Sequence, residues 1–149
     1  MRISIPKPLK LEHKELHREL VVAVNTSGPI GKAAEAVAKV LHPHFVKEEE
    51  YALPPIGLLK VLAKGKVSKD MEAVLVMTDK LKKDLPNMLK EHKAVVAALR
   101  KLVAAAKKEK RNDIVHFAEK LMLHAKTEEE VLYPAAILIG EYLKEKLNR

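Results

Sequence analysis

The sequence contains no cysteine and few aromatic residues, and each scarcity excludes a class of site. Without cysteine the chain forms no disulfide, iron–sulfur cluster, thiolate zinc site or cysteine nucleophile. Two Phe, three Tyr and no Trp are too few for a surface that stacks the bases of single-stranded nucleic acid. No apolar run approaches the roughly 18 residues of a membrane span, and residues 1–6 lack the apolar stretch of a signal peptide. We therefore expect a cytoplasmic protein with no membrane partner.

Charge is abundant, and its distribution bears on the choice of partner. The 149 residues include 28 Lys+Arg and 20 Asp+Glu, which gives a formal net charge of +8. The lysines are scattered among acidic residues, a pattern typical of solvated helix surfaces rather than of a stripe that follows phosphates. We expect no nucleic-acid partner. The length and the 48% apolar content fit a single domain over residues 1–149.

Apolar residues recur with helical spacing throughout, and no segment alternates with period two for long enough to indicate a sheet. Prolines and glycines cluster at the expected boundaries. The pattern predicts four main helices, at about 9–24, 30–53, 84–107 and 113–133. Shorter helices are expected at 57–62 and 71–83, with a fresh start at Asp84-Leu85-Pro86 and an amphipathic extension from Pro134 to Leu147. The expected fold is an all-α, up-down antiparallel four-helix bundle with its core over 9–134.

The most informative feature is an internal repeat. The tripeptide E-H-K at 12–14 recurs at 91–93, an offset of 79 residues. The pattern L-x-x-H-x-x-x-E-E-E-x-x-x-P at 41–54 recurs at 121–134, an offset of 80 residues. Helices one and two are therefore echoed, in order, by helices three and four. Two similar hairpins can pack about a pseudo-twofold axis, and the repeated His and Glu side chains would then meet near that axis.

The repeated side chains have the spacing of metal ligands. His44 and Glu48, like His124 and Glu128, are four residues apart and therefore project from one helix face. Burying these groups with further imidazoles among Leu, Val and Ala would cost several kcal/mol without partners, a cost that metal binding removes. Two carboxylates with terminal imidazoles predict a dinuclear centre, and nitrogen and oxygen ligands suit iron or manganese, with zinc also accepted. The Glu-x-x-His motif of ferritin-like bundles and the His-Glu-x-x-His motif of zinc proteases are both absent.

These motifs resemble the hemerythrin-like domain, the HHE cation-binding family. The resemblance includes His13 and His92, the two H-x-x-x-E motifs, and the segments E-E-Y-A-L-P at 49–54 and E-E-V-L-Y-P at 129–134. It spans residues 9–134 and implies a four-helix bundle around two non-haem iron ions. One ion would take His13 and His44 and the other His92 and His124, with Glu48 and Glu128 bridging. Members of the family bind O2 reversibly, sense O2 or iron, or handle NO and iron–sulfur repair.

One departure from the family concerns a fifth histidine. Oxygen-carrying hemerythrins have His-x-x-x-His on the third helix, whereas here Val96 follows His92 and the pair His13-x-x-x-His17 lies on the first helix. Either the fifth ligand has changed sides or the site has four histidines with His17 outside it. The full set of predicted metal ligands is His13, His17, His44, Glu48, His92, His124 and Glu128.

The remaining polar residues near the motifs receive other interpretations. Glu49 and Glu129 lie about 140° around their helices from the histidines, which favours a role as surface acids. Tyr133 either reaches the ligands or packs at a helix end.

The resemblance favours a di-iron protein that binds O2 or NO for sensing, carriage or storage. The alternative is a di-iron enzyme or iron-handling protein, which needs an acid or base beside an open metal position.

Overall fold

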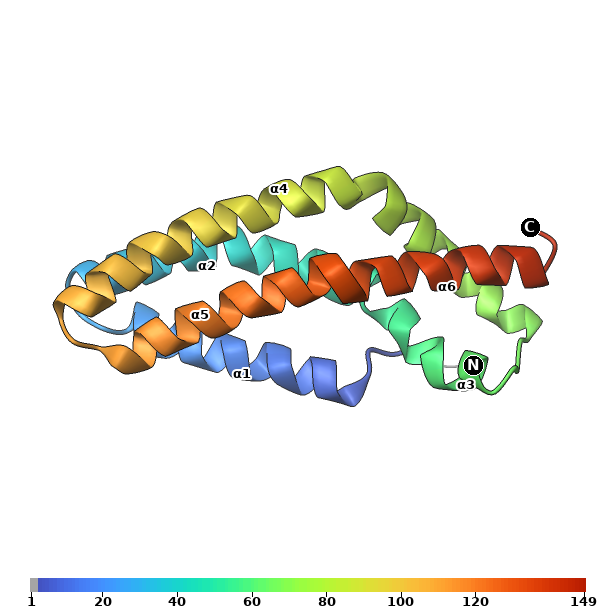
Figure 1. Ribbon diagram of the computed structural model, residues 1–149, viewed down its shortest axis with the longest axis horizontal. Coiled ribbons are helices and arrows are strands. Elements are labelled where there is room, and N and C mark those ends of the chain that lie inside the picture. The colour runs from blue at the N-terminus through green and yellow to red at the C-terminus, as the bar shows by residue number, and fades with distance from the viewer. Residues whose placement is uncertain (1–2) are drawn as a thin grey trace.

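The computed structural model describes residues 3–149, and four long helices build the molecule: α1 (Lys7–Val24), α2 (Pro29–Lys47), α4 (Ala73–Lys108) and α5 (Asn112–Thr127). α2 packs against α1 and α4, and α5 packs against α4 and α1. Consecutive long helices are therefore neighbours that run in opposite directions (Figure 1). The predicted all-α, up-down four-helix bundle is confirmed.

Shorter segments connect and extend the bundle. After α2 come the π-helix η1 (Glu48–Ala52), the 3-10 helix η2 (Pro54–Leu58) and α3 (Leu59–Ala63), and the 3-10 helix η3 (Lys69–Glu72) precedes α4. After α5 come the π-helix η4 (Glu128–Leu132) and α6 (Tyr133–Lys146), which continues the line of α5 beyond the bundle (Figure 1). The structure thus interrupts the two helices predicted at 30–53 and 113–133 with a π-helical segment at the same place in the repeat.

The turn between α1 and α2 requires a glycine at position 31. A Cβ atom on Gly31 would lie 2.1 Å from the backbone oxygen of Thr26, far inside contact distance. Only glycine allows the start of α2 to approach the end of α1 this closely. Pro29 occupies the first turn of α2, where its missing N–H costs nothing.

The predicted helix start at Asp84 is wrong, because α4 is one helix of 36 residues that contains Pro86. Proline removes one backbone hydrogen bond, and a helix bends there rather than ending when its surroundings hold it. Figure 1 shows α4 bending in its first half. Asp84 does not cap a helix. Its carboxylate instead accepts hydrogen bonds from Tyr51 at 2.5 Å, Asn87 at 3.0 Å and Lys47 at 3.3 Å.

The core consists of three apolar clusters arranged along the molecule. The largest fills the closed end of the bundle and includes Leu20, Leu99 and Phe117. The second, around Met88, joins the bundle to the extension, and the third lies beneath α6 and α3. Along each of α1, α2, α4 and α5 the repeated histidine falls between the first and second clusters. A polar layer therefore crosses the bundle between two apolar layers.

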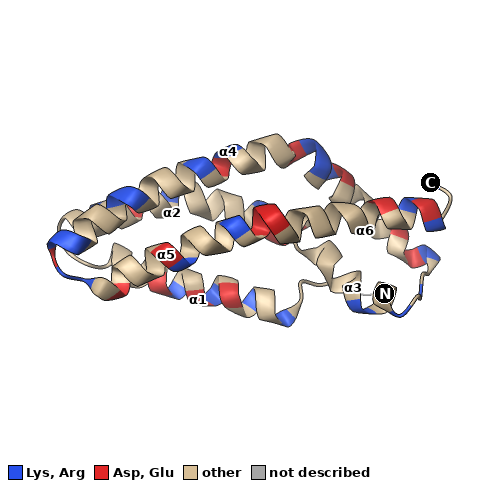
Figure 2. Cartoon of the chain, viewed as in Figure 1, with Lys and Arg blue, Asp and Glu red and all other residues tan. Residues whose placement is uncertain are grey.

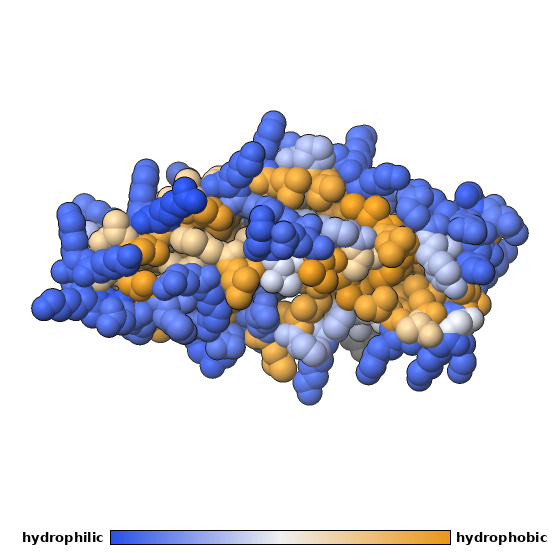
Figure 3. Space-filling model, viewed as in Figure 1, coloured by the Kyte–Doolittle hydropathy of each residue, from blue (hydrophilic) through white to orange (hydrophobic). Residues whose placement is uncertain are grey.

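The surface agrees with the scattered charge of the sequence. Figure 2 shows Lys and Arg interspersed with Asp and Glu along the visible helices. Apolar residues also reach the surface on the face that Figure 3 shows. The exposed large apolar residues of the described chain include Leu123, Val131 and Leu138. Over residues 3–149, no helix combines the length and the apolar character that crossing a membrane requires.

Candidate metal centre

Six ionisable side chains lie buried in the polar layer. They are at most 5% exposed, which is rare for such groups unless they are paired or bind metal. Apart from Thr78 and the two hydroxyl-bearing tyrosines Tyr51 and Tyr133, they are the buried polar side chains among the residues that the structure describes. The six are His13, His44, Glu48, His92, His124 and Glu128.

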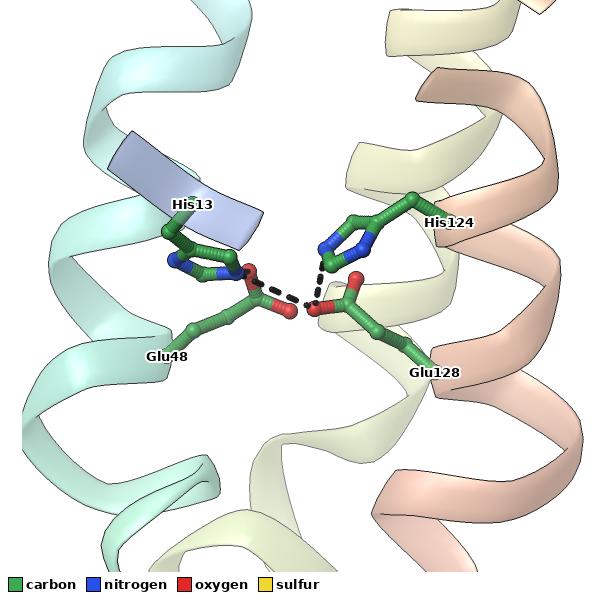
Figure 4. A group of neighbouring side chains, drawn as sticks. All are labelled: His13, Glu48, His124 and Glu128. Atoms are coloured by element: carbon green, nitrogen blue, oxygen red, sulfur yellow. Dashed lines mark ion pairs between the residues drawn. The ribbon is translucent and has the colours of Figure 1, made fainter. Parts of the chain in front are cut away.

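These side chains form two groups of four that share both carboxylates. In each group the four potential ligand atoms lie within 4.8 Å of one another. The first group contains His13 and His124 with Glu48 and Glu128, which converge from α1, η1 and the α5–η4 segment (Figure 4). The second contains His44 and His92 with the same two carboxylates. Because each glutamate belongs to both groups, the two groups are parts of one connected site.

The grouping of the histidines differs from the expected one. The family resemblance implied that His13 pairs with His44 and His92 with His124. In the structure the ring centroids of His13 and His124 are 5.1 Å apart, and those of His44 and His92 are 4.6 Å apart. The pairs therefore form between α1 and α5 and between α2 and α4, which pack side by side. The side chains are thus grouped differently from the pairing that the resemblance implies, and which ion each histidine binds stays a prediction.

The first group contains the clearest sign of a cation site. His13 Nε2, Glu48 Oε1, His124 Nε2 and Glu128 Oε2 are all buried, and none makes a hydrogen bond. His124 Nε2 lies 3.1 Å from Glu128 Oε2, and His13 Nε2 lies 3.5 Å from Glu48 Oε1. An unsatisfied buried polar group costs about 1–3 kcal/mol, and more if it is charged. Four such atoms facing one point fit the donor set of a divalent metal ion.

The second group differs because the hydroxyl of Tyr133 lies among its ligand atoms. This hydroxyl donates to Glu48 Oε2 at 2.5 Å and lies 3.1 Å from both His44 Nε2 and His92 Nε2. Its distance to Glu128 Oε1 is 3.5 Å. Tyr133 is fully buried. Of the two roles left open for Tyr133, the structure therefore shows the contact with the ligands.

An outer ring of four acidic residues surrounds the histidines. Glu91 accepts from His44 Nδ1 at 2.7 Å, and Glu129 accepts from His92 Nδ1 at 3.0 Å. Two further acids complete the ring: Glu12 contacts His124 Nδ1, and Glu49 lies 3.7 Å from His13 Nδ1. A carboxylate on the outer nitrogen fixes the tautomer and orientation of an imidazole whose Nε2 then faces the metal.

The ring corrects the interpretation of Glu49 and Glu129 as surface acids. Each points sideways to a histidine of the adjacent helix rather than to the histidine of its own helix. The internal repeat indicated all four outer acids. Glu12 and Glu91 begin the two E-H-K tripeptides, and Glu49 and Glu129 directly follow Glu48 and Glu128. Spacing along a single helix cannot reveal such contacts, since they form between helices.

Comparison with known proteins agrees with the site. The model of the hemerythrin HHE cation binding domain matches residues 5–136. The chain belongs to the hemerythrin HHE family. No curated protein and no solved structure matched the chain. The assignment thus comes from the family match, and the two buried His/Glu groups of this hemerythrin HHE domain fit a metal-ion site.

The electrostatics of the HHE site follow from burial and from the crowding of acids. Burial disfavours charged imidazoles, but Glu48 and Glu91 outweigh it and raise the pKa of His44 to about 9. Against the same effect of burial, Glu128 and Glu48 raise the pKa of His124 to about 9. Burial and the Glu128 carboxylate raise the pKa of Glu48, as expected for two acids that share a site. Metal ions must therefore displace protons to bind at neutral pH.

His17 is the one expected ligand that the structure leaves outside both groups of the HHE site. It is exposed on α1 and lines a surface pocket with His13, His42, Phe45 and Glu49. A step of four residues turns about 40° around a helix, and here that step carries the side chain from the interior to solvent. The structure thus brings together the histidines of the four-histidine alternative, and ligation by His17 stays a prediction that the His17→Ala variant tests.

Proposed function

We propose that this hemerythrin HHE domain holds two non-haem iron ions and binds O2 or a related ligand such as NO, for sensing, carriage or storage. The observation that carries the proposal is the set of four unsatisfied ligand atoms in the first group, beside a second group that shares both carboxylates. Bound ferrous iron would supply the electrons and the open coordination position that such ligands need. Nitrogen and oxygen donors without thiolate suit iron, and the same donors also accept manganese or zinc.

The protein residues would fix the metals and keep the site dry. Glu48 and Glu128 each offer one oxygen to each group, which holds two cations close together and offsets their charge. The apolar clusters on both sides of the polar layer keep water away. The Phe45 ring stacks on the His13 ring with 4.1 Å between their centroids, and it shields the imidazole further from water. Low local polarity strengthens the interaction between carboxylate and metal.

Two surface pockets border histidines of the first group. One surface pocket reaches His124 between α1 and α5, beside Leu16 and Leu123. Another reaches His13 between α1 and α2, beside Phe45. Both pockets end at a histidine whose Nε2 has no hydrogen bond. Because the Nε2 atoms themselves are buried behind these pockets, the arrangement favours a ligand of a few atoms.

A second candidate is a di-iron enzyme or iron-handling protein for peroxide, NO or iron–sulfur chemistry. The exposed position of His17 supports it, because the first group then has only two imidazoles and two carboxylate oxygens. Fewer protein ligands leave more open positions for a reactant. The His17→Ala variant discriminates between the functions: a five-histidine carrier would lose its stable adduct, while a four-histidine site would keep its behaviour.

Metal analysis with anaerobic iron titration tests the proposal. We expect two ferrous ions per chain, followed by a change in visible absorption when O2 or NO is admitted. Glu48→Ala and Glu128→Ala should each weaken the binding of both ions, because each carboxylate belongs to both groups. Glu50→Ala and Glu130→Ala alter exposed acids outside the groups and serve as matched controls. Loss of one ion with full retention of the other would contradict the bridging role, and absence of iron binding would overturn the proposal.

A further inference from the structure

Tyr133 occupies a position that only one of the two groups possesses. Its hydroxyl oxygen contacts His44 Nε2, His92 Nε2 and one oxygen of each glutamate. We propose that the Tyr133 phenol oxygen is itself a ligand to the metal ion of the second group, so that the two ions of the centre are chemically different. This inference rests on the proposed di-iron function.

The hydroxyl oxygen of Tyr133 lies beside every potential ligand atom of the second group. It is 3.1 Å from His44 Nε2 and from His92 Nε2. It is 2.5 Å from Glu48 Oε2 and 3.5 Å from Glu128 Oε1. The phenol oxygen is therefore close enough to these four donor atoms to bind the same ion as they do.

The π-helix η4 explains how Tyr133 reaches this position. Tyr133 follows Glu128 by five residues, and in a regular α-helix it would point about 140° away from that side chain. A π-helix joins residues five apart through its hydrogen bonds and brings them to nearly the same face. η4 begins at Glu128 and ends at Leu132, directly before Tyr133. The irregular segment thus adds the phenol to the face that carries the bridging carboxylate.

The internal repeat shows how the two groups came to differ at this position. The residue that corresponds to Tyr133 in the first half of the chain is Leu53, which also follows a π-helix but is apolar. The first group therefore keeps unsatisfied ligand atoms, whereas those of the second group contact the phenol. A pseudo-symmetric pair of hairpins has in this way produced one ion with an additional protein ligand and one ion more open to small molecules.

The step that joins the phenol to a metal ion is a simple exchange. The phenol O–H bond breaks, its proton leaves to solvent, and the oxygen lone pair forms the bond to the ion, with no change in oxidation state. The phenol already donates to Glu48 Oε2 at 2.5 Å, which provides the first acceptor for that proton. An anionic oxygen ligand also offsets the charge of a ferric ion better than a neutral imidazole does.

The Tyr133→Phe variant tests the assignment, because it removes one oxygen and keeps the ring that packs in the second apolar cluster. The full chain is loaded anaerobically with ferrous iron and oxidised with ferricyanide. Wild type should then show a visible phenolate-to-iron charge-transfer band, and resonance Raman excitation in that band should enhance tyrosine ring modes. Tyr133→Phe should lack the band. The variant should also bind one of its two irons more weakly. Losing an outer partner of a ligand typically weakens binding about 10- to 100-fold, and losing the ligand itself should weaken it at least as much. Tyr142→Phe, which alters a partly exposed tyrosine on α6, should match wild type.

The possible failures are distinguishable. If wild type binds no iron, the proposed function falls and this inference falls with it. If wild type binds two irons without tyrosine-enhanced Raman modes, the phenol is not a ligand and only this inference is overturned, a result that needs no variant. Unchanged or tighter iron binding by folded Tyr133→Phe would likewise overturn it, since the hydroxyl would then merely satisfy the empty group.

Discussion

Replacing Glu91 by Gln tests whether the outer acids tune the metal centre. Glu91 Oε1 accepts from His44 Nδ1 at 2.7 Å, while Glu91 Oε2 accepts from Lys47 at 2.7 Å. Glutamine keeps the size of the side chain and one acceptor but removes the charge that polarises the imidazole. Loss of such a partner weakens metal binding about 10- to 100-fold, which corresponds to about 1.4–2.8 kcal/mol.

The structure also predicts the order of effects around the ring. Glu129 lies 3.0 Å from His92 Nδ1 and its side chain is 29% exposed, so Glu129→Gln should behave like Glu91→Gln. Glu49 lies 3.7 Å from His13 Nδ1 and its side chain is 56% exposed, so water screens the contact. Exposed ion pairs contribute about 1 kcal/mol or less, so Glu49→Gln should weaken metal binding less than about tenfold.

A competition titration against a chromogenic chelator measures these affinities, with Glu130→Gln as the matched control. Glu130 is exposed, and its nearest cation is Lys126 at 3.9 Å, so its loss should leave metal affinity unchanged. Thermal denaturation of each variant without metal separates an effect on the fold from an effect on the site. Equal affinities for Glu91→Gln and Glu130→Gln would refute the reasoning that the outer carboxylates tune the ligands.

Four further predictions concern the metal, the pH, one histidine and one glycine. Chelation should lower the thermal midpoint, because the metal binds the folded chain and offsets buried groups without partners; an unchanged midpoint would contradict this. His44 and His124 have a pKa raised from 6.5 to about 9. Their contribution to the stability of the chain without metal is thus complete below about pH 6.5 and lost as the pH rises towards 9, which urea titrations at several pH values will detect. His17→Ala should leave iron stoichiometry and affinity unchanged, and a lost ion would restore the five-histidine site. Gly140→Ala places a carbon 2.2 Å from Thr78 Oγ1 and should destabilise the chain by about 1–3 kcal/mol in the same titration, whereas wild-type stability would contradict the close packing of α6 on α4.

The candidate ligands that pair along the chain were accessible to sequence reasoning because helical spacing governs them. A spacing of four residues places His44 and Glu48 on one face, and the repeat transfers the same argument to His124 and Glu128. The structure buries these four together with His13 and His92. The bundle itself followed from helical periodicity and short connections, which depend on local chemistry.

The features that sequence reasoning missed or left open depend on contacts between helices or on irregular backbone. The contact of Tyr133 with the ligands requires η4, and a single sequence contains no rule for where an α-helix widens to a π-helix. The outer acids and the pairing of His13 with His124 depend on how neighbouring helices are rotated against each other. The continuity of α4 through Pro86 depends on tertiary packing that outweighs the local preference to stop.

The continuity of α4 also determines how far a single cooperative folding unit extends. The family match ends at residue 136, yet α6 continues to Lys146, and Ile139 and Leu143 share a buried cluster with Val74 near the start of α4. Because α4 runs without a break from that cluster to His92, the far end and the metal layer should unfold together rather than in turn. A chain shortened at residue 136 would fray α4 from its first turn inward and loosen the site from a distance.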